Sequence, residues 1–310
     1  LFAELTESPA YRIAGVVDDD FIGPPEMHGM YLGGVDDLER ILKEAPVGAL
    51  YCALPIRSMY NQAQRAVSIC RRVGVEVRYS TELFETCSAQ QHSYVSAHVP
   101  FAILRTVRED STRTVKRVID IFGALLLLIA SAPILAVAAL AVKLTSPGPV
   151  LFSQERCGLN RKHFRIFKVR TMVVDAEHLQ QKYESLNELD GPVFKIRLDP
   201  RVTPVGRFLR KSSIDELPQL WNVLMGDMSL VGPRPLALRD FLRIDDGGHL
   251  RRFSMKPGLT CLWQISGRNN TGFEQWIRKD LEYIDCWSLL LDASILLRTL
   301  PAVLCGRGAM

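Results

Sequence analysis

Short apolar runs alternate with amphipathic stretches over residues 11–104. Three runs are apolar enough for buried strands, at residues 11–17, 47–54 and 75–79. Two stretches between them have the spacing of helices, at residues 35–43 and 59–72. Strands and helices that alternate at this spacing predict a parallel sheet with helices on its faces. We therefore expect an α/β domain over residues 1–104.

Asp18 follows the first of these strands, where an acidic residue can bind the ribose of a dinucleotide. The Gly-x-Gly-x-x-Gly turn that should precede such a residue is missing from the chain. An ordinary loop position is therefore favoured for Asp18. The pattern predicts a truncated, Rossmann-like domain without evidence for a cofactor.

Residues 121–142 form a run of 22 residues without a charged side chain, in which Ser131 carries the one hydroxyl group. As a helix this run would be ~33 Å long, which is enough to cross a bilayer. Three structures fit that length: a buried core helix, a transmembrane span, and a re-entrant hairpin that enters and leaves on one side.

Two features favour the hairpin. Pro133 lies near the middle of the run, where it removes a backbone hydrogen bond and bends a helix. Basic residues flank both ends of the run, and the positive-inside rule places both flanks in the cytoplasm. These residues are Arg113, Lys116 and Arg117 before the run and Lys143 and Arg156 after it.

Composition and charge agree with a membrane-associated protein. Of the 310 residues, 47% are hydrophobic, and the formal net charge is +4. Arg and Lys gather in three stretches, at residues 105–117, 156–170 and 197–211. Such clusters suit phosphate groups or an anionic membrane surface. We expect partners of these kinds and no nucleic acid.

The seven cysteines are scattered and form no Cys-x-x-Cys pair, so we expect reduced thiols in a cytoplasmic protein. The six histidines are equally dispersed, which argues against a transition-metal site. Residue 1 is Leu, so we expect the sequence to begin partway into a longer protein.

The densest group of chemically active side chains lies at residues 207–219. Pro218 is best tolerated in the first turn of a helix, which puts Asp215 and Glu216 just ahead of a helix N-terminus. Two adjacent carboxylates beside Arg210 and neighbouring cations suit a phosphate-bound divalent cation. One carboxylate would bind Mg²⁺ while the other attacks phosphorus.

Other interpretations of these residues stay open on spacing alone. Ser213-x-x-Glu216 also has the form of a capping box, which requires no catalysis. Arg234 lies in a rigid Pro-Arg-Pro turn that would direct it toward a phosphate, or it is a turn arginine in solvent. Asp280 has a surface ion pair as its default interpretation. Lys195 is either a phosphate contact or an exposed side chain. The pattern of residues 262–265 predicts a strand.

Ten segments in one order connect residues 113–310 with a known family. They are KRVID (116–120), PGPVLF (147–152), QERCG (154–158), FKVRTM (167–172), DPR (199–201), GRFLR (206–210), DELPQLWN (215–222), GDMSLVGPRP (226–235), KPGLT (256–260) and GRN (267–269). This part of the chain resembles the bacterial sugar transferases, the polyprenyl-phosphate phosphoglycosyl transferases built around a re-entrant membrane helix. Residues 1–104 resemble the nucleotide-binding-like domain of the larger members, in which transmembrane helices precede that domain.

The resemblance implies roles for individual residues. Asp215 would be the nucleophile that forms an aspartyl-phosphosugar intermediate, and Glu216 its acidic partner. Mg²⁺ would bridge this pair and the diphosphate of the substrate. Arg210, Arg234 and Arg268 match positions at the active site of the family. Asp280 matches another such position, and Lys195 is a further candidate for substrate binding.

The resemblance also implies the reaction and the place where it occurs. A sugar 1-phosphate would pass from a UDP-sugar, with glucose or galactose favoured, to polyprenyl phosphate, and UMP would leave. The catalytic domain would lie on the cytoplasmic face of the bacterial inner membrane and act in exopolysaccharide synthesis. The sequence leaves the oligomeric state open, and a homo-oligomer is one alternative.

The expected organisation has four parts. They are a truncated Rossmann-like domain (1–104), a basic linker (105–117), a re-entrant membrane helix (118–145) and a mixed, mostly α-helical catalytic domain (146–310). Two other functions remain as alternatives. A UDP-releasing glycosyltransferase would use an Asp-x-Asp motif, which Asp18-Asp-Asp20 imitates. A membrane-tethered scaffold or sensor would need no chemistry at Asp215.

Overall fold

A computed structural model of the chain describes most of its residues. The described ranges are 5–6, 12–23, 25–54, 58–80, 94–96, 99–104, 111–188, 191–194, 196, 198–244, 246–266 and 272–304. The chain divides into two compact units. The first contains Leu1–Arg108 and Asp246–Ser254, and the second contains Glu109–Asp245 and Met255–Met310.

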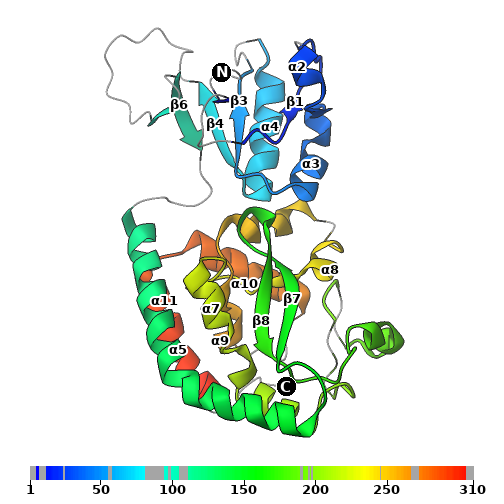
Figure 1. Cartoon of the computed structure of the whole chain (residues 1–310). Helices are drawn as coiled ribbons and strands as arrows, with labels where there is room; N and C mark the ends of the chain where they lie inside the picture. The colour runs from blue at the N-terminus through cyan, green and yellow to red at the C-terminus, as the bar shows by residue number, and fades with distance from the viewer. Residues whose placement is uncertain are drawn as a thin grey trace. The chain divides into compact units, whose positions relative to one another are not determined.

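The first unit contains short strands and helices; all but the last of them run from blue to blue-green in Figure 1. In chain order they are β1 (Val16–Val17), α2 (Pro25–His28), β2 (Tyr31–Gly33), η1 (Val35–Asp37), α3 (Leu38–Glu44), β3 (Ala49–Cys52), α4 (Tyr60–Val73), β4 (Glu76–Ser80), β5 (Tyr94–Ser96), β6 (Val99–Leu104) and the later 3-10 helix η5 (Gly247–Ser254). The amphipathic α4 buries Ala63, Ala66, Cys70 and Val73. It ends at Gly74, whose φ of 82° is the left-handed conformation that glycine adopts readily.

The predicted parallel sheet is confirmed for the strands expected at residues 47–54 and 75–79, but the sheet as a whole is mixed. Strand β3 pairs in parallel with β4, but β4 pairs antiparallel with β6, and β6 with β5. Strands β1 and β2 form a separate parallel pair. The antiparallel strands β5 and β6 follow the last predicted strand. The alternation of strands and helices that predicts parallel pairing does not continue there. The segment Gly247–Ser254 packs against α4 and α3 of this unit.

The second unit begins with α5 (Ser111–Thr145), a helix of 35 residues with Pro133 inside it. Among the described residues α5 alone is long and apolar enough to cross a membrane by length and composition, and 17% of its most apolar window is buried. Large apolar side chains remain exposed along it, such as Phe122 (68%), Leu126 (69%) and Val137 (70%). Exposed apolar surface of this extent is typical of a surface in contact with lipid.

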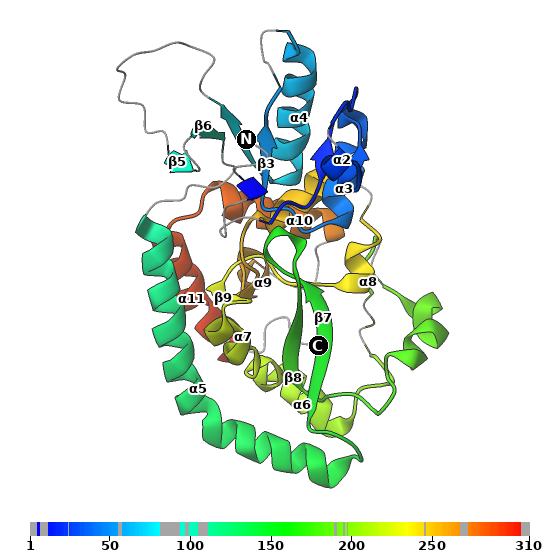
Figure 2. The same cartoon turned by 45° about the horizontal axis from the view of Figure 1, so that its top comes forward.

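Figures 1 and 2 show that α5 bends sharply along its length. Both of its parts pack against the second unit. The earlier part contacts α7 (Gln219–Met225) and β9 (Ser229–Val231), while the later part joins a core cluster in which Ala138 and Val142 contact Leu209 of α6 (Pro204–Lys211). The two parts of the apolar helix are therefore held by the same unit.

Polar groups fix the start of α5. Lys116 donates to Asp292 Oδ2 at 2.6 Å and to the Val231 carbonyl at 3.0 Å. Arg117 donates to the carbonyl oxygens of Val223 (2.6 Å) and Leu224, the last turn of α7. A cation at a helix C-terminus satisfies carbonyls that lack partners within the helix.

A long antiparallel hairpin forms the centre of the second unit, drawn in green in Figures 1 and 2. Strand β7 (Leu151–Cys157) pairs with β8 (His163–Val169), and β10 (Leu236–Ala237) extends the sheet on the other side of β7. A second small sheet joins β9 in parallel with β11 (Gly258–Thr260). Side chains that are far apart in the sequence therefore lie close together on this sheet.

Helices make up most of the remainder of the second unit. They are the 3-10 helices η2 (Leu159–Arg161), η3 (His178–Leu186) and η4 (Ile214–Glu216), and the helices α8 (Leu238–Phe241), α9 (Leu262–Ile265), α10 (Phe273–Asp285) and α11 (Leu289–Leu304). The strand-like interpretation of residues 262–265 is wrong, because these residues form α9. A four-residue apolar run has no period of its own, and the extended Cys261 before it starts a helical turn instead.

Candidate functional site

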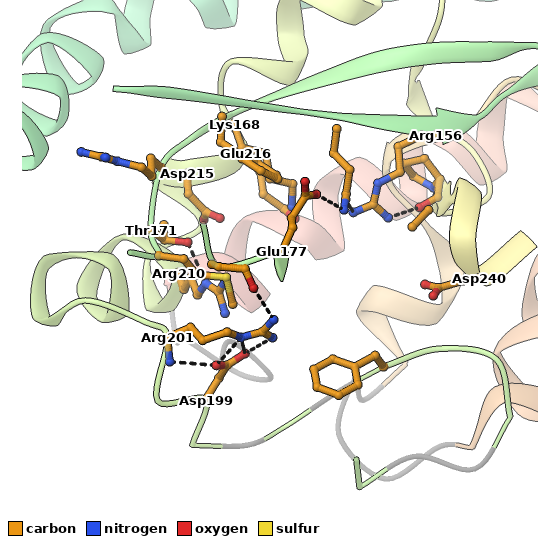
Figure 3. Close-up of a pocket in the computed structure, with 18 of the residues that line it drawn as sticks. Arg156, Lys168, Thr171, Glu177, Asp199, Arg201, Arg210, Asp215, Glu216 and Asp240 are labelled. Carbon is orange, nitrogen blue, oxygen red and sulfur yellow. Dashed lines mark hydrogen bonds and ion pairs between the residues drawn. The ribbon is translucent and has the colours of Figure 1, made fainter. Parts of the chain in front are cut away.

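A cavity of about 880 Å³ lies beside the β7–β8 hairpin. Its lining includes polar and charged side chains from both strands of the hairpin, from α6, η4 and α8, and from the loops between them. Figure 3 shows Asp215 and Glu216 beside Lys168, and Arg210 beside Thr171. Segments that are distant in the sequence therefore supply one charged site.

The turn between α6 and α7 positions the two acidic residues. Ser213 has a φ of 56°, in the left-handed region, and reverses the chain before η4. The Ser213 side chain makes no capping bond, and the Glu216 side chain points to basic groups, so the capping-box interpretation is wrong. Pro218 then precedes α7, which begins at Gln219. Asp215 and Glu216 lie ahead of this helix, as the sequence predicts.

Asp215 is 6% exposed and lines the cavity. Its carboxylate accepts no side-chain hydrogen bond from any group in the part of the chain that the structure describes. Burial raises the pKa of Asp215 to about 6; Lys168 and Arg210 act against this rise, and Glu216 adds to it. A buried carboxylate without a donor has its oxygens available to an incoming group.

Glu216 lies in the opposite situation. Its Oε1 accepts from Lys168 Nζ at 2.8 Å and from Arg234 at 3.0 Å. Lys168 comes from β8, and Arg234 from the turn between β9 and β10. Because two cations share one carboxylate oxygen, positive charge remains for an anionic ligand.

Arg210 reaches the cavity from the end of α6. Its Nε donates to Thr171 Oγ1 at 2.9 Å. Burial lowers the pKa of this guanidinium, while Asp215 and Asp199 act in the opposite direction. The close approach of α6 to the residues after β8 requires Gly206, because a Cβ there would overlap the Thr171 carbonyl oxygen.

A second acid–base pair closes another part of the cavity wall. Arg201 donates to Asp199 Oδ1 at 2.9 Å and to Oδ2 at 2.6 Å, a two-pronged contact. It also binds the Ala176 carbonyl at 2.9 Å and lies over the Phe194 ring. Burial acts to raise the pKa of Asp199, but the Arg201 bonds hold it below its usual value. This pair is satisfied within the protein, so it shapes the cavity.

The structure brings four of the predicted site residues together. Asp215, Glu216, Arg210 and Arg234 all line the cavity. Asp280 is buried (1% exposed) on α10 and is not part of the cavity lining. Lys195 and Arg268 lie outside the described residues. The individual roles of all seven residues stay predictions.

Sequence reasoning did not single out several residues of the site. They are Lys168, Arg156, Thr171, Asp199 and Arg201. Lys168 and Arg156 belong to a basic cluster that is visible in the sequence. Which members of that cluster reach the cavity depends on the register of the hairpin, in which Phe152 pairs with Lys168 and Arg156 with Phe164. This pairing is a tertiary fact that the charge pattern alone does not contain.

The residues present fit Mg²⁺ in its usual form. No group of three or more His, Cys, Asp or Glu side chains that would hold a metal occurs among the described residues. Mg²⁺ commonly needs only one or two carboxylates, with water and substrate phosphates supplying its other oxygen ligands. The donor-free Asp215 carboxylate and the neighbouring Glu216 are carboxylates of that kind. The site therefore fits a phosphate-bound magnesium ion.

Comparisons with known proteins agree with this site. The bacterial sugar transferase family matches residues 111–306. The galactosyl transferase CpsE of Streptococcus agalactiae serotype III is 46% identical over 195 residues, which cover 63% of this chain and 43% of that protein. A UDP-glucose:undecaprenyl-phosphate glucose-1-phosphate transferase of Caulobacter vibrioides is 48% identical over 198 residues, covering 61% of this chain and 69% of the relative.

One relative also matches the first unit. A protein of the same name from Klebsiella pneumoniae is 35% identical over 297 residues, which cover 93% of this chain and 61% of that protein. The chain thus spans between 43% and 69% of the length of these three relatives. Because the family match covers residues 111–306 and includes the entire cavity, the chain belongs to the bacterial sugar transferase family.

Proposed function

We propose that the chain transfers a sugar 1-phosphate from a UDP-sugar to polyprenyl phosphate and releases UMP. The family membership supports the reaction class, and the names of two relatives specify UDP-glucose and undecaprenyl phosphate. The name of another specifies galactosyl transfer, so glucose and galactose are the favoured sugars. The observation that carries the proposal is the buried carboxylate of Asp215, which has no hydrogen-bond donor among the described residues and lies in a cavity lined with basic groups.

In the first half-reaction, an Asp215 carboxylate oxygen attacks the phosphorus that bears the sugar. The bond from this phosphorus to the bridging oxygen breaks, and UMP leaves with that oxygen. An aspartyl-phosphosugar remains on the enzyme. Attack requires ionised Asp215, and Lys168 is the strongest of the cations that lower its pKa against burial.

In the second half-reaction, an oxygen of polyprenyl phosphate attacks the same phosphorus. The bond to the Asp215 oxygen breaks, which restores the carboxylate and gives a polyprenyl diphosphate sugar. Phosphoryl transfer depends mainly on positioning and on neutralised charge. Arg210, Arg234 and Lys168 supply fixed positive charge around the reacting phosphorus.

Asp215 and Glu216 would hold the Mg²⁺ ion together with the diphosphate. When bound, the ion would neutralise charge that develops on the phosphate oxygens. Glu216 is held in place by Lys168 and Arg234. These two contacts orient its carboxylate beside Asp215.

We also propose that α5 is a re-entrant hairpin that keeps the cavity at the level of the lipid phosphates. Its two parts pack on one unit, its exposed side chains are apolar, and basic residues flank both ends. The second unit then lies on the cytoplasmic face of the inner membrane, where UDP-sugars occur. For the first unit, the parallel β3–β4 pair with α4 supports a truncated Rossmann-like fold.

The identity of the released nucleotide tests this function. The protein in detergent receives Mg²⁺, polyprenyl phosphate and one UDP-sugar from a panel, and the nucleotides are separated afterwards. Release of UMP, lost in Asp215→Asn and kept in Asp227→Asn, is the expected result; Asp227 lies outside the cavity lining. Release of UDP would indicate an ordinary glycosyltransferase and contradict the proposal.

A further inference from the structure

Arg156 is a basic residue of the cavity that the reaction described above does not use. It projects from β7 into the cavity, as Figure 3 shows. Its two terminal nitrogens donate to neutral acceptors, the Pro235 carbonyl at 3.1 Å and Gln154 Oε1 at 2.6 Å. The guanidinium is thus held in one orientation by groups that do not neutralise its charge.

The third nitrogen of this guanidinium is unsatisfied. Arg156 Nε is buried and has no hydrogen-bond partner within the described ranges. A buried donor without a partner costs about 1–3 kcal/mol, so such a group is normally satisfied by water or by a ligand. Arginine binds phosphate oxygens through two parallel N–H groups, a geometry that Nε and a terminal nitrogen provide.

Charge around Arg156 points to an anion as that ligand. The charged group that acts most strongly on it is another cation, Arg234, and burial together with Arg234 lowers the pKa of Arg156 to about 10. Glu216 is already shared by Arg234 and Lys168. The hydrogen bonds of Asp240 come from Arg239 at 3.4 Å. Glu177, the third carboxylate that acts on Arg156, accepts from Gln154 Nε2 at 2.9 Å. Because all three carboxylates are bonded to other groups, the charged Arg156 guanidinium suits an anionic ligand such as a diphosphate.

The proposed reaction has two phosphate-bearing substrates, and both must bind in the cavity. The cavity has two basic regions, one at Arg210 and one at Arg156. Arg210 follows Leu209, which packs against the apolar helix α5, and its strongest charged neighbour is Asp215. The strongest charged neighbours of Arg156 are instead Arg234 and Asp240. Glu216 acts on both guanidiniums, but the strongest charged neighbours of Arg156 differ from those of Arg210, which adjoins the apolar helix.

We infer that Arg156 binds the diphosphate of the nucleotide-sugar together with Arg234. Arg156 itself does not bind the lipid phosphate. This inference rests on the proposed function, because it assigns one of the two substrates of that reaction. Arg156 thereby acts in the first half-reaction, and the second half-reaction proceeds without it.

Steady-state kinetics separate the two half-reactions. In a ping-pong scheme, kcat/KM for the UDP-sugar reports only the first half-reaction, and kcat/KM for polyprenyl phosphate reports only the second. We expect Arg156→Gln to lower the first value about 10- to 100-fold, the loss of a hydrogen bond to a charged group, and to leave the second unchanged. Arg243→Gln, which loses only a surface pair with Glu184, is the matched control.

The other outcomes overturn the inference. An equal loss in both values would give Arg156 a general structural role, and a loss confined to polyprenyl phosphate would assign it to the lipid. Calorimetric binding of UDP to the full chain provides a readout independent of turnover. Weaker UDP binding in Arg156→Gln is expected even if the wild-type protein proves to release UDP, which would contradict the proposed function alone. Unchanged UDP binding would contradict the inference itself.

Discussion

The Lys168 ammonium lies 2.8 Å from Glu216 Oε1 and joins β8 to the turn that carries Asp215. Both side chains are largely buried, with 19% and 16% of their surface exposed. A buried ion pair matters most when one partner is removed, because the other charge is then left without compensation. This contact therefore links the hairpin to the turn of the acidic pair and places Lys168 where it lowers the pKa of Asp215.

Substitution of Lys168 by Met should alter the pH dependence of activity. Lys168 is the strongest of the groups that lower the pKa of Asp215, so its loss should move the acid limb of kcat/KM for the UDP-sugar to higher pH by about 1 unit. Because a pKa near 7 leaves about half of the carboxylate ionised, activity at pH 7 should fall about twofold from this cause. The measurement is a pH–rate profile with Lys162→Met, an exposed lysine outside the cavity lining, as control. A fall in rate with an unmoved acid limb would contradict this explanation.

Asp215→Asn should stabilise the protein at neutral pH while it abolishes activity. The pKa of Asp215 is raised from 3.8 to about 6 in the fold, so folding favours its protonated form. That contribution is fully present below pH 3.8 and is lost as pH rises through 6, which amounts to about 3 kcal/mol in the metal-free protein.

Thermal unfolding at several pH values tests this expectation. The Tm of Asp215→Asn should exceed that of the wild type at pH 8, and the difference should shrink toward pH 4. The control is Glu282→Gln, which removes an exposed acid that pairs with Lys279 on the surface of α10. A difference that is constant with pH would mean that ionisation of Asp215 is not the cause.

Removal of divalent cations should stop turnover. Two adjacent carboxylates and a substrate diphosphate are oxygen ligands that suit Mg²⁺. EDTA should abolish UMP release, and excess Mg²⁺ should restore it. Full activity in EDTA-treated protein would show that Arg and Lys side chains neutralise the diphosphate without a metal ion.

The sequence predicted elements whose signal is local. The apolar run at residues 121–142 lies within α5, and the helix predicted at residues 59–72 coincides closely with α4. The start of α5 at Ser111 was not predicted, because Lys116 and Arg117 are polar and find their partners, Asp292 and the end of α7, more than a hundred residues away. Charged residues that were assigned to a linker thus form the anchored first turns of the helix.

The same distinction applies to the candidate site. Asp215 and Glu216 were predictable because their position before Pro218 is a local relationship. Lys168 was not, because its role depends on a bond across 48 residues of sequence. The capping-box interpretation failed at Ser213 because tertiary partners for Glu216 outcompete a local backbone contact.

The hairpin proposal for α5 predicts that both of its flanks face the same side of the membrane. In a chain whose native cysteines are changed to serine, Arg113→Cys and Lys143→Cys should each react with an impermeant maleimide from the cytoplasmic side only. Labelling from opposite sides would establish a full span and remove this proposal, but it would leave the chemistry at Asp215 untouched.

The most direct test of the account is a single turnover without acceptor lipid. The protein receives Mg²⁺ and a UDP-sugar in the absence of polyprenyl phosphate, and its peptides are analysed by mass spectrometry after rapid quenching. We predict about one UMP released per protein and a peptide containing Asp215 heavier by a hexose phosphate less water. Release of UMP only after lipid is added, with no adduct on Asp215, would contradict the covalent mechanism.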